Sequence, residues 1–230
     1  MMPVKREVAP GEYYYLSARG TAHLNIFREK TDYARLLFSL LYFQSPLVFK
    51  NIGRICGGFS EEGFPMDNDL VEIVLAERLI ELLAFSIRPN GFHLLLKEGE
   101  KGGIAFYMHR ILTGYTKFFQ NKYRVSGHIF EGRYRAVHLK SDAEILRLSA
   151  YIHKGPSDIP LSKSSDADYP WSSFQDFVKG NRWGGLIAPE LIASKFAGTF
   201  ASNYNDYVKS LSYKELKNEF GALQVRRKIP

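Results

Sequence analysis

Two apolar runs joined by a tight turn constrain the fold of this 230-residue chain more than any other feature. The runs are Leu82–Arg88 and Phe92–Lys97, and the turn between them is Pro89-Asn90-Gly91. Apolar runs on either side of a turn of this composition are typical of an antiparallel hairpin. We therefore predict two adjacent strands here, and the rest of the chain must complete a sheet around them.

The segments around the hairpin alternate between strand-like and helix-like patterns. Tyr13–Ala18 is rich in β-forming residues and predicts a first strand. Apolar spacing and helix-start residues predict helices from Thr31–Asp32 onward, over 69–80, over 104–122 and over 143–152. Short helices are expected within 189–220 and a further strand over 136–139. The segment 45–64 is expected to be an irregular connection.

This order of strand, helix, hairpin, helix and strand predicts an α+β fold. We expect a ferredoxin-like, palm-like antiparallel sheet with flanking helices and a helical C-terminal extension. The α+β domain would span residues 1–180, and the extension would span residues 181–230.

Composition narrows the class of protein. Hydrophobic residues make up 45% of the chain, enough to bury a core. Cys56 is the single cysteine, which excludes an internal disulfide and a multi-cysteine zinc site. Apolar runs of signal-peptide or membrane-span length are missing from the sequence, so we expect a cytoplasmic protein with no membrane partner.

The net charge of +7 favours a polyanionic partner, and its distribution is uneven. From Ile104 to Lys140 only Glu131 opposes the basic side chains. Within this stretch, Ser126–Arg135 mixes glycines, cations and aromatic rings, which suits phosphate contacts and base stacking but equally a solvated turn. We predict the following as nucleic-acid-binding residues: Arg110, Lys117, Lys122, Arg124, Arg133 and Arg135.

Two side chains are candidates for chemistry. Alternation along the strand places His93 away from the more apolar face, which carries Phe92 and Leu94. Tyr115 lies on or near the apolar stripe of the helix that follows. Taken alone, a strand histidine and a tyrosine on an apolar stripe are more often structural than catalytic.

Five blocks in order resemble a known family, the REP-associated tyrosine transposases, which are relatives of the single-strand insertion-sequence transposases. The resemblance covers about residues 13–173. Its blocks are residues 83–96, Gly114-Tyr115-Thr116-Lys117-Phe118-Phe119, residues 126–134, Tyr151-Ile152-His153 and Tyr169-Pro170-Trp171-Ser172-Ser173.

The resemblance implies a palm-like sheet that presents a His-hydrophobic-His pair beside a tyrosine on a helix. In this family a divalent ion, magnesium or manganese, polarises a phosphate of single-stranded DNA near a hairpin, and the tyrosine attacks to leave a 5′-phosphotyrosine. The resemblance assigns the nucleophile to Tyr115 and a metal ligand to His93. Gln120 is a further candidate ligand, and a monomer is expected.

One departure from the family pattern bears on activity. Where the family reads Pro-Asn-His-hydrophobic-His, this chain has Gly91 in place of the first histidine, on the strand face of His93. Two hypotheses follow: a DNA strand transferase, active or weakened, and a hairpin-DNA or RNA binding protein that does not cleave. Both place the phenol of Tyr115 and the imidazole of His93 in one basic groove.

Overall fold

The computed structural model describes residues 8–60, 63–155 and 166–221. Within these ranges the strands form one antiparallel sheet of four strands in the order β2-β3-β1-β4. The strands are β1 Tyr13–Arg19, β2 Ile80–Arg88, β3 Gly91–Glu98 and β4 Arg135–Leu139. The helices are α1 Lys30–Tyr42, α2 Ile52–Gly57, α3 Asn68–Ala76, α4 Gly103–Tyr123, α5 Asp142–Lys154, α6 Phe174–Val178, α7 Glu190–Ala193, α8 Phe200–Ser210 and α9 Tyr213–Leu216.

The predicted α+β, ferredoxin-like fold is confirmed. Strands β2 and β3 form the predicted hairpin, in which Arg88 pairs with Gly91. Strand β1 lies between β3 and β4 and is antiparallel to both. The connections β1-α1-β2 and β3-α4-β4 therefore each join two parallel strands, and crossovers of this kind have one preferred hand.

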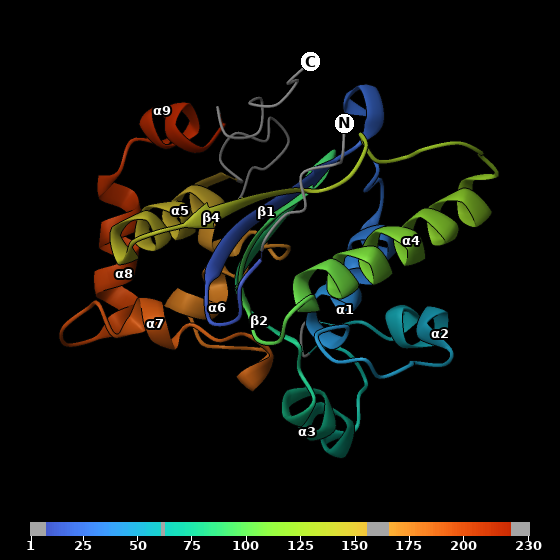
Figure 1. The fold of residues 1–230 in the computed structure, drawn as a ribbon, viewed down its shortest axis with the longest axis horizontal. Helices are drawn as coiled ribbons and strands as arrows, with labels where there is room; N and C mark the ends of the chain where they lie inside the picture. Colours follow the sequence, from blue (N-terminus) through green and yellow to red (C-terminus); the bar gives the residue numbers. More distant parts are fainter. Residues whose placement is uncertain (1–7, 61–62, 156–165, 222–230) are drawn as a thin grey trace.

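The sheet separates two helical layers (Figure 1). Helices α1 and α4 lie on one face, and the Tyr107 hydroxyl of α4 donates a hydrogen bond to the Leu40 carbonyl of α1 at 2.8 Å. Helix α5 lies on the other face with α6 and α8 beside it. Two crossovers of the same hand place both of their helices on one face, so α5, which follows the last strand, covers the other.

Local polar contacts set where the helices begin. Glu29 and Asp32 form a reciprocal capping box at the start of α1. The buried Glu98 carboxylate, at the end of β3, accepts hydrogen bonds from the backbone N–H groups of Gly102 and Ile104 at 2.7 Å. This carboxylate satisfies N–H groups at the start of α4 and complements the helix dipole.

Two predicted boundaries are wrong. The helix expected over 69–80 ends at Ala76, because Ile80 already pairs with Glu98 as the first residue of β2. The connection expected to be irregular over 45–64 contains the short helix α2, whose Cys56 packs into the core. Strand pairing in the first place and packing of α2 against α1 in the second outweigh the local pattern.

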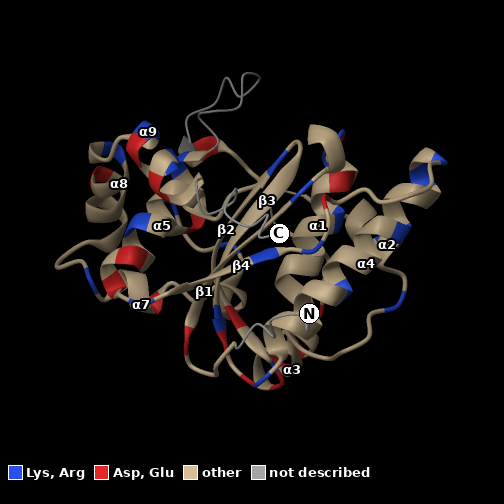
Figure 2. Cartoon of the chain, turned by 45° about the horizontal axis from the view of Figure 1, so that its top comes forward, with Lys and Arg blue, Asp and Glu red and all other residues tan. Residues whose placement is uncertain are grey.

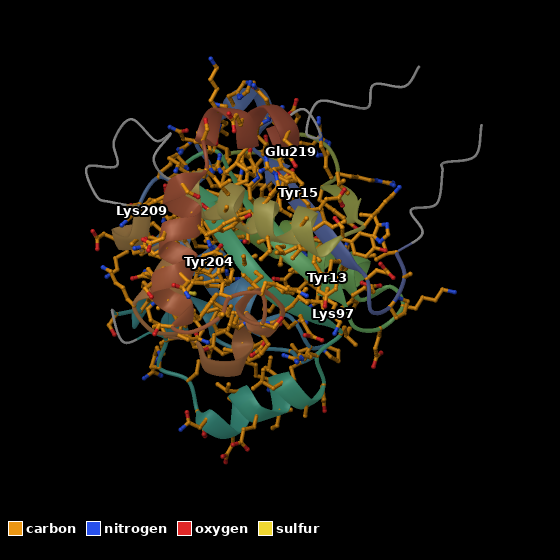
Figure 3. All side chains as sticks on the ribbon, turned by 90° about the vertical axis from the view of Figure 1, so that its left-hand side faces the viewer. Tyr13, Tyr15, Lys97, Tyr204, Lys209 and Glu219 are labelled. Carbon is orange, nitrogen blue, oxygen red and sulfur yellow. The ribbon has the colours of Figure 1, made fainter. Side chains whose placement is uncertain are left out.

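The C-terminal segment contains helices, as expected, and packs against the sheet layer rather than standing apart. His153 of α5 shares a hydrogen bond of 2.7 Å with the Tyr204 hydroxyl of α8 and one of 2.8 Å with the Ser173 hydroxyl. Figure 3 looks onto this side and shows the helix of Tyr204 in front of the sheet. The boundary at residue 180 stays a prediction, and residues 222–230 of the extension lie outside the described ranges. Among the described residues, no helix is both long and apolar enough to span a bilayer.

Candidate nucleic-acid binding site

His93 lies in a row of paired residues that crosses the sheet. It pairs with Ser86 of β2 and with Ser17 of β1, and Ser17 pairs in turn with Arg135 of β4. Residues paired in this way share a face of the sheet. The side chains of this row therefore point toward α5, whose Tyr151 ring contacts the His93 ring.

The next row on the same face contains the glycine of the altered motif. Gly91 pairs with Arg88 on one side and with Arg19 on the other. A Cβ atom at Gly91 would lie 2.5 Å from the Ala18 carbonyl oxygen and 3.1 Å from the Arg19 Cα. Strand β1 thus approaches more closely than any side chain at this position allows, and the position is flanked by two guanidinium groups.

His93 is enclosed by aromatic rings. Its side chain is 8% exposed, and its Nδ1 shares a hydrogen bond of 2.7 Å with the Tyr15 hydroxyl. The Tyr15 ring stacks on the imidazole, and the Tyr151 ring meets it edge-on at 5.7 Å between centroids. Burial, followed by the positive charge of Arg88, holds the pKa of His93 well below its usual value. The imidazole is therefore neutral at pH 7.

A cavity of about 760 Å³ opens on this face of the sheet. Gly91, His93 and Tyr151 line it. Its basic side chains come from three strands, from the loop before β4 and from the C-terminal segment: Arg19, Arg88, Arg133, Arg135 and Lys217. Its acidic side chain, Glu131, forms an ion pair of 2.6 Å with Arg19.

Tyr115 does not share this cavity, and the expected geometry is wrong. Its side chain is 1% exposed, and its hydroxyl donates to the Ile26 carbonyl at 2.5 Å. Its ring contacts Phe130, which contacts Phe92, the neighbour of His93 that points to the opposite face. Burial raises the pKa of Tyr115 far above its usual value. The sheet separates this phenol from the imidazole.

The structure instead brings Tyr151 to His93. Tyr151 lies on α5, is 2% exposed and also packs against Tyr213 and Phe220 of the C-terminal segment. The guanidinium of Arg88 lies 5.6 Å from its ring centroid. The sequence offered a signal for this residue, because the block Tyr151-Ile152-His153 is one of the five that carry the family resemblance.

The predicted nucleic-acid contacts divide between the two layers. Arg133 and Arg135 line the cavity. The other four belong to α4 or its C-cap and do not line it: Arg110, Lys117, Lys122 and Arg124. Figure 2 shows that Lys and Arg occur on both layers and on β4.

Two of the α4 cations already have protein partners. Arg110 donates to the carbonyls of Ser45 and Leu47 and lies over the Phe43 ring. Lys122 forms an ion pair with the buried Asp32. Both side chains hold α4 to its neighbours, so that of the four predicted contacts on α4 and its C-cap, Lys117 and Arg124 are the exposed ones.

The described residues around this cavity do not fit a divalent metal ion. Among the described residues, no three side chains of His, Cys, Asp or Glu form a group that could hold one. Nδ1 of His93 is bonded to Tyr15, and Gly91 offers no side-chain ligand. Gln120 lies on α4 and donates to the Gly127 carbonyl at 2.8 Å. The guanidinium groups of Arg88 and Arg135 would repel a cation in the same cavity.

Fold and cavity together define a ferredoxin-like α+β protein with a basic cavity on the sheet face opposite its crossover helices. The fold is similar to that of a solved REP-associated tyrosine transposase bound to a REP hairpin. The TM-score is 0.51 at 14% sequence identity, over 83% of this chain and 93% of that one. No protein-family model matches this chain, and no curated protein does.

Proposed function

We propose that this protein binds single-stranded or hairpin DNA in the cavity on the His93 face and does not cleave it. The observation that carries the proposal is the charge of the cavity wall, where the described residues supply five cationic side chains against one carboxylate, and that carboxylate is paired with one of the five, Arg19. Cations gathered in a groove beside aromatic rings are suited to the phosphates and bases of a single strand. The structural neighbour, which binds a REP hairpin, supports DNA as the polyanion.

The motif residues support binding without cleavage. Metal-assisted attack on a phosphate needs a cation held beside the nucleophile. Gly91 supplies no ligand, and the position lacks room for a larger side chain. The His93 imidazole is buried, neutral and engaged by Tyr15. The described residues of this face therefore offer basic side chains for phosphates and lack a group of ligands for the ion.

Two matched double variants test where the DNA binds. Arg133→Gln/Arg135→Gln removes two charges from the cavity, and Lys117→Gln/Arg124→Gln removes two from the α4 layer. The probe is a fluorescent DNA hairpin with a single-stranded flank, measured by anisotropy over a salt series in EDTA. We expect affinity to fall about tenfold or more for the first variant and less than twofold for the second. The slope of log K against log salt should shrink by about 0.7 for each lost phosphate contact.

The same titration contains the outcomes that would overturn the proposal. An equal or larger loss in the Lys117/Arg124 variant would place the DNA on the α4 layer. Tighter binding of the matched RNA hairpin would favour RNA as the partner. Affinity that is indifferent to salt would rule out the basic cavity as the binding surface.

A second candidate function is DNA strand transfer, favoured by the contact between the Tyr151 and His93 rings. In this function Tyr151, rather than Tyr115, is the nucleophile. Incubation of the labelled hairpin with protein and manganese, followed by a denaturing gel, separates the two functions. Strand transfer predicts a covalent adduct that Tyr151→Phe abolishes and Tyr115→Phe preserves. The binding function predicts no adduct with any of the three proteins.

A further inference from the structure

Arg88 occupies an unusual position beside the altered motif. It ends β2 and pairs across the hairpin with Gly91, so its side chain leaves the sheet on the His93 face. It lines the basic cavity and lies over the ring of Tyr151. Its charge also acts on the neighbouring imidazole of His93. Arg88 thus lies beside both motif residues: it pairs with Gly91, and its charge acts on His93.

The guanidinium of Arg88 is incompletely bonded. Nη1 donates to the Tyr213 hydroxyl at 3.3 Å. Nε and Nη2 are buried and have no hydrogen-bond partner in the described part of the chain, and no ion pair of Arg88 occurs there. A buried cation without a partner destabilises the folded state, so a site of this kind is more often built for a ligand than for stability.

The two unpartnered atoms share one edge of the guanidinium. Nε–H and Nη2–H point in nearly parallel directions, the arrangement that binds two oxygens of a phosphate at once. The guanidinium itself packs directly against Gly155, where a Cβ atom would lie 1.8 Å from Nη2, so any larger residue at position 155 would displace this group. Arg135, across the sheet on the same face, has an unpartnered buried Nη1 as well.

We propose that the guanidinium of Arg88 binds one backbone phosphate of the DNA strand and supplies the positive charge that the family resemblance assigns to a metal ion. The inference rests on the proposed DNA-binding function and adds that binding is independent of metal. Gly91 removes a metal ligand of the family motif, and Gly155 leaves space for the guanidinium of Arg88. This guanidinium donates two hydrogen bonds to the phosphate. A guanidinium binds phosphate through its own charge and hydrogen bonds, so this contact forms without a metal ion and should persist in EDTA.

A phosphate scan tests this contact at the level of single atoms. In a series of hairpins, one phosphate at a time in the single-stranded flank is replaced by a neutral methylphosphonate, and affinity is measured in EDTA. For the wild-type protein we expect the methylphosphonate at one position to lower affinity about tenfold or more. This is the effect expected from losing a charge-assisted pair of hydrogen bonds. Arg88→Gln should bind unmodified DNA about as weakly as the wild type binds the modified hairpin. In this variant the same methylphosphonate should lower affinity less than twofold further.

Control variants separate binding from folding. Arg54→Gln on α2 makes the same change of charge outside the cavity and should keep both the affinity and the scan of the wild type. Arg88→Lys keeps the charge and loses the paired donors, so its affinity should be intermediate. The melting temperature of free Arg88→Gln should equal or exceed that of the wild type, because an unpartnered buried cation has been removed. If Arg88→Gln fails to fold, Arg88→Lys carries the test.

The outcomes distinguish this inference from the function on which it rests. If the hairpin binds and Arg88→Gln leaves affinity and the scan unchanged, Arg88 is not the phosphate ligand and the DNA-binding function stands. If wild-type binding disappears in EDTA and returns with magnesium, the positive charge is a metal ion and the inference is wrong. If the wild type binds no hairpin in either condition, the proposed function fails and this inference fails with it.

Discussion

Tyr115 is a core residue whose hydroxyl has a structural task. Its donor bond to the Ile26 carbonyl ties α4 to the loop before α1. The carbonyl is enclosed by the same aromatic cluster, which includes Phe27. Loss of the hydroxyl therefore leaves a buried acceptor without its partner, which costs more than the loss of a solvated hydrogen bond.

We predict that Tyr115→Phe lowers the free energy of unfolding by about 1–3 kcal/mol and changes hairpin affinity less than twofold. Urea denaturation and the anisotropy titration measure the two quantities. A variant with wild-type stability and lost DNA binding would contradict the structural role, because it would place the phenol on the binding surface.

His153 makes stability depend on pH. It is fully buried between Tyr204 and Ser173, and burial lowers its pKa from 6.5 to about 3. The unfolded chain binds a proton at this histidine below about pH 6.5, whereas the folded chain does not. Its contribution to stability is therefore complete above that pH and is lost as the pH falls toward 3.

Between pH 7 and pH 5 the free energy of unfolding should fall by about 2 kcal/mol on account of His153. His93, whose pKa is also lowered, adds a loss in the same direction. Urea denaturation at both pH values measures the change, and His153→Gln should show a smaller one. Stability that rises on acidification would mean that the His153 imidazole is charged in the folded protein.

At the scale of elements, the hairpin and the helices could be predicted from the local sequence pattern. The face of the sheet that each helix covers could be predicted only from the topology. Apolar runs and the turn at Pro89 predicted β2 and β3. The stripe that includes Tyr115 was also visible, but an apolar stripe is the side of a helix that packs on the sheet. Residues on that stripe are buried, so they make poor candidates for a nucleophile.

Topology could have corrected the choice of tyrosine. In the predicted order of elements both crossover helices lie on one face, and the more apolar side of β3, with Phe92 and Leu94, packs against them. His93 must then face the helix after the last strand, which carries Tyr151. The unpartnered atoms of Arg88 had no signal in the sequence, because they depend on the packing of Gly155 and Tyr213 around that side chain.

The approach of β1 to Gly91 yields a prediction about the strand pair. Gly91→His must push Ala18 and Arg19 away, which should cost roughly 1–3 kcal/mol of stability, as overpacking does elsewhere. The variant should gain no manganese-dependent cleavage. Asn90→His, which adds the same imidazole one residue earlier in the turn, is the control and should cost less. A Gly91→His protein that is as stable as the wild type and forms a covalent adduct would show that the strands can separate to rebuild the site.

At the scale of the whole molecule, the sheet divides two kinds of surface. The α4 side holds Arg110, Lys117, Lys122 and Arg124 of the basic stretch from Ile104 to Lys140, yet Arg110 and Lys122 are used within the protein. The α5 side holds fewer sequence-adjacent cations but collects them from distant segments into one cavity. Charge density along the chain therefore does not locate the basic cavity, whereas the topology of the sheet does.

The C-terminal segment completes that cavity. Arg147 of α5 forms an ion pair of 2.6 Å with Glu219, and Phe220 packs on Tyr151. Lys217 and Gly221 line the cavity wall. Figure 3 shows Glu219 and Tyr15 on the same side of the molecule. Residues at both ends of the described chain thus contribute to the surface on which DNA is proposed to bind.

The central claim is that DNA lies on the His93 face, and ultraviolet cross-linking tests it most directly. A hairpin carrying 5-iodouracil in its single-stranded flank is irradiated with the wild-type protein in EDTA, and the modified peptides are identified by mass spectrometry. We predict cross-links on the peptide that contains Tyr134, between the cavity arginines Arg133 and Arg135. Cross-links confined to Phe118 and Tyr123 on α4 would contradict the account.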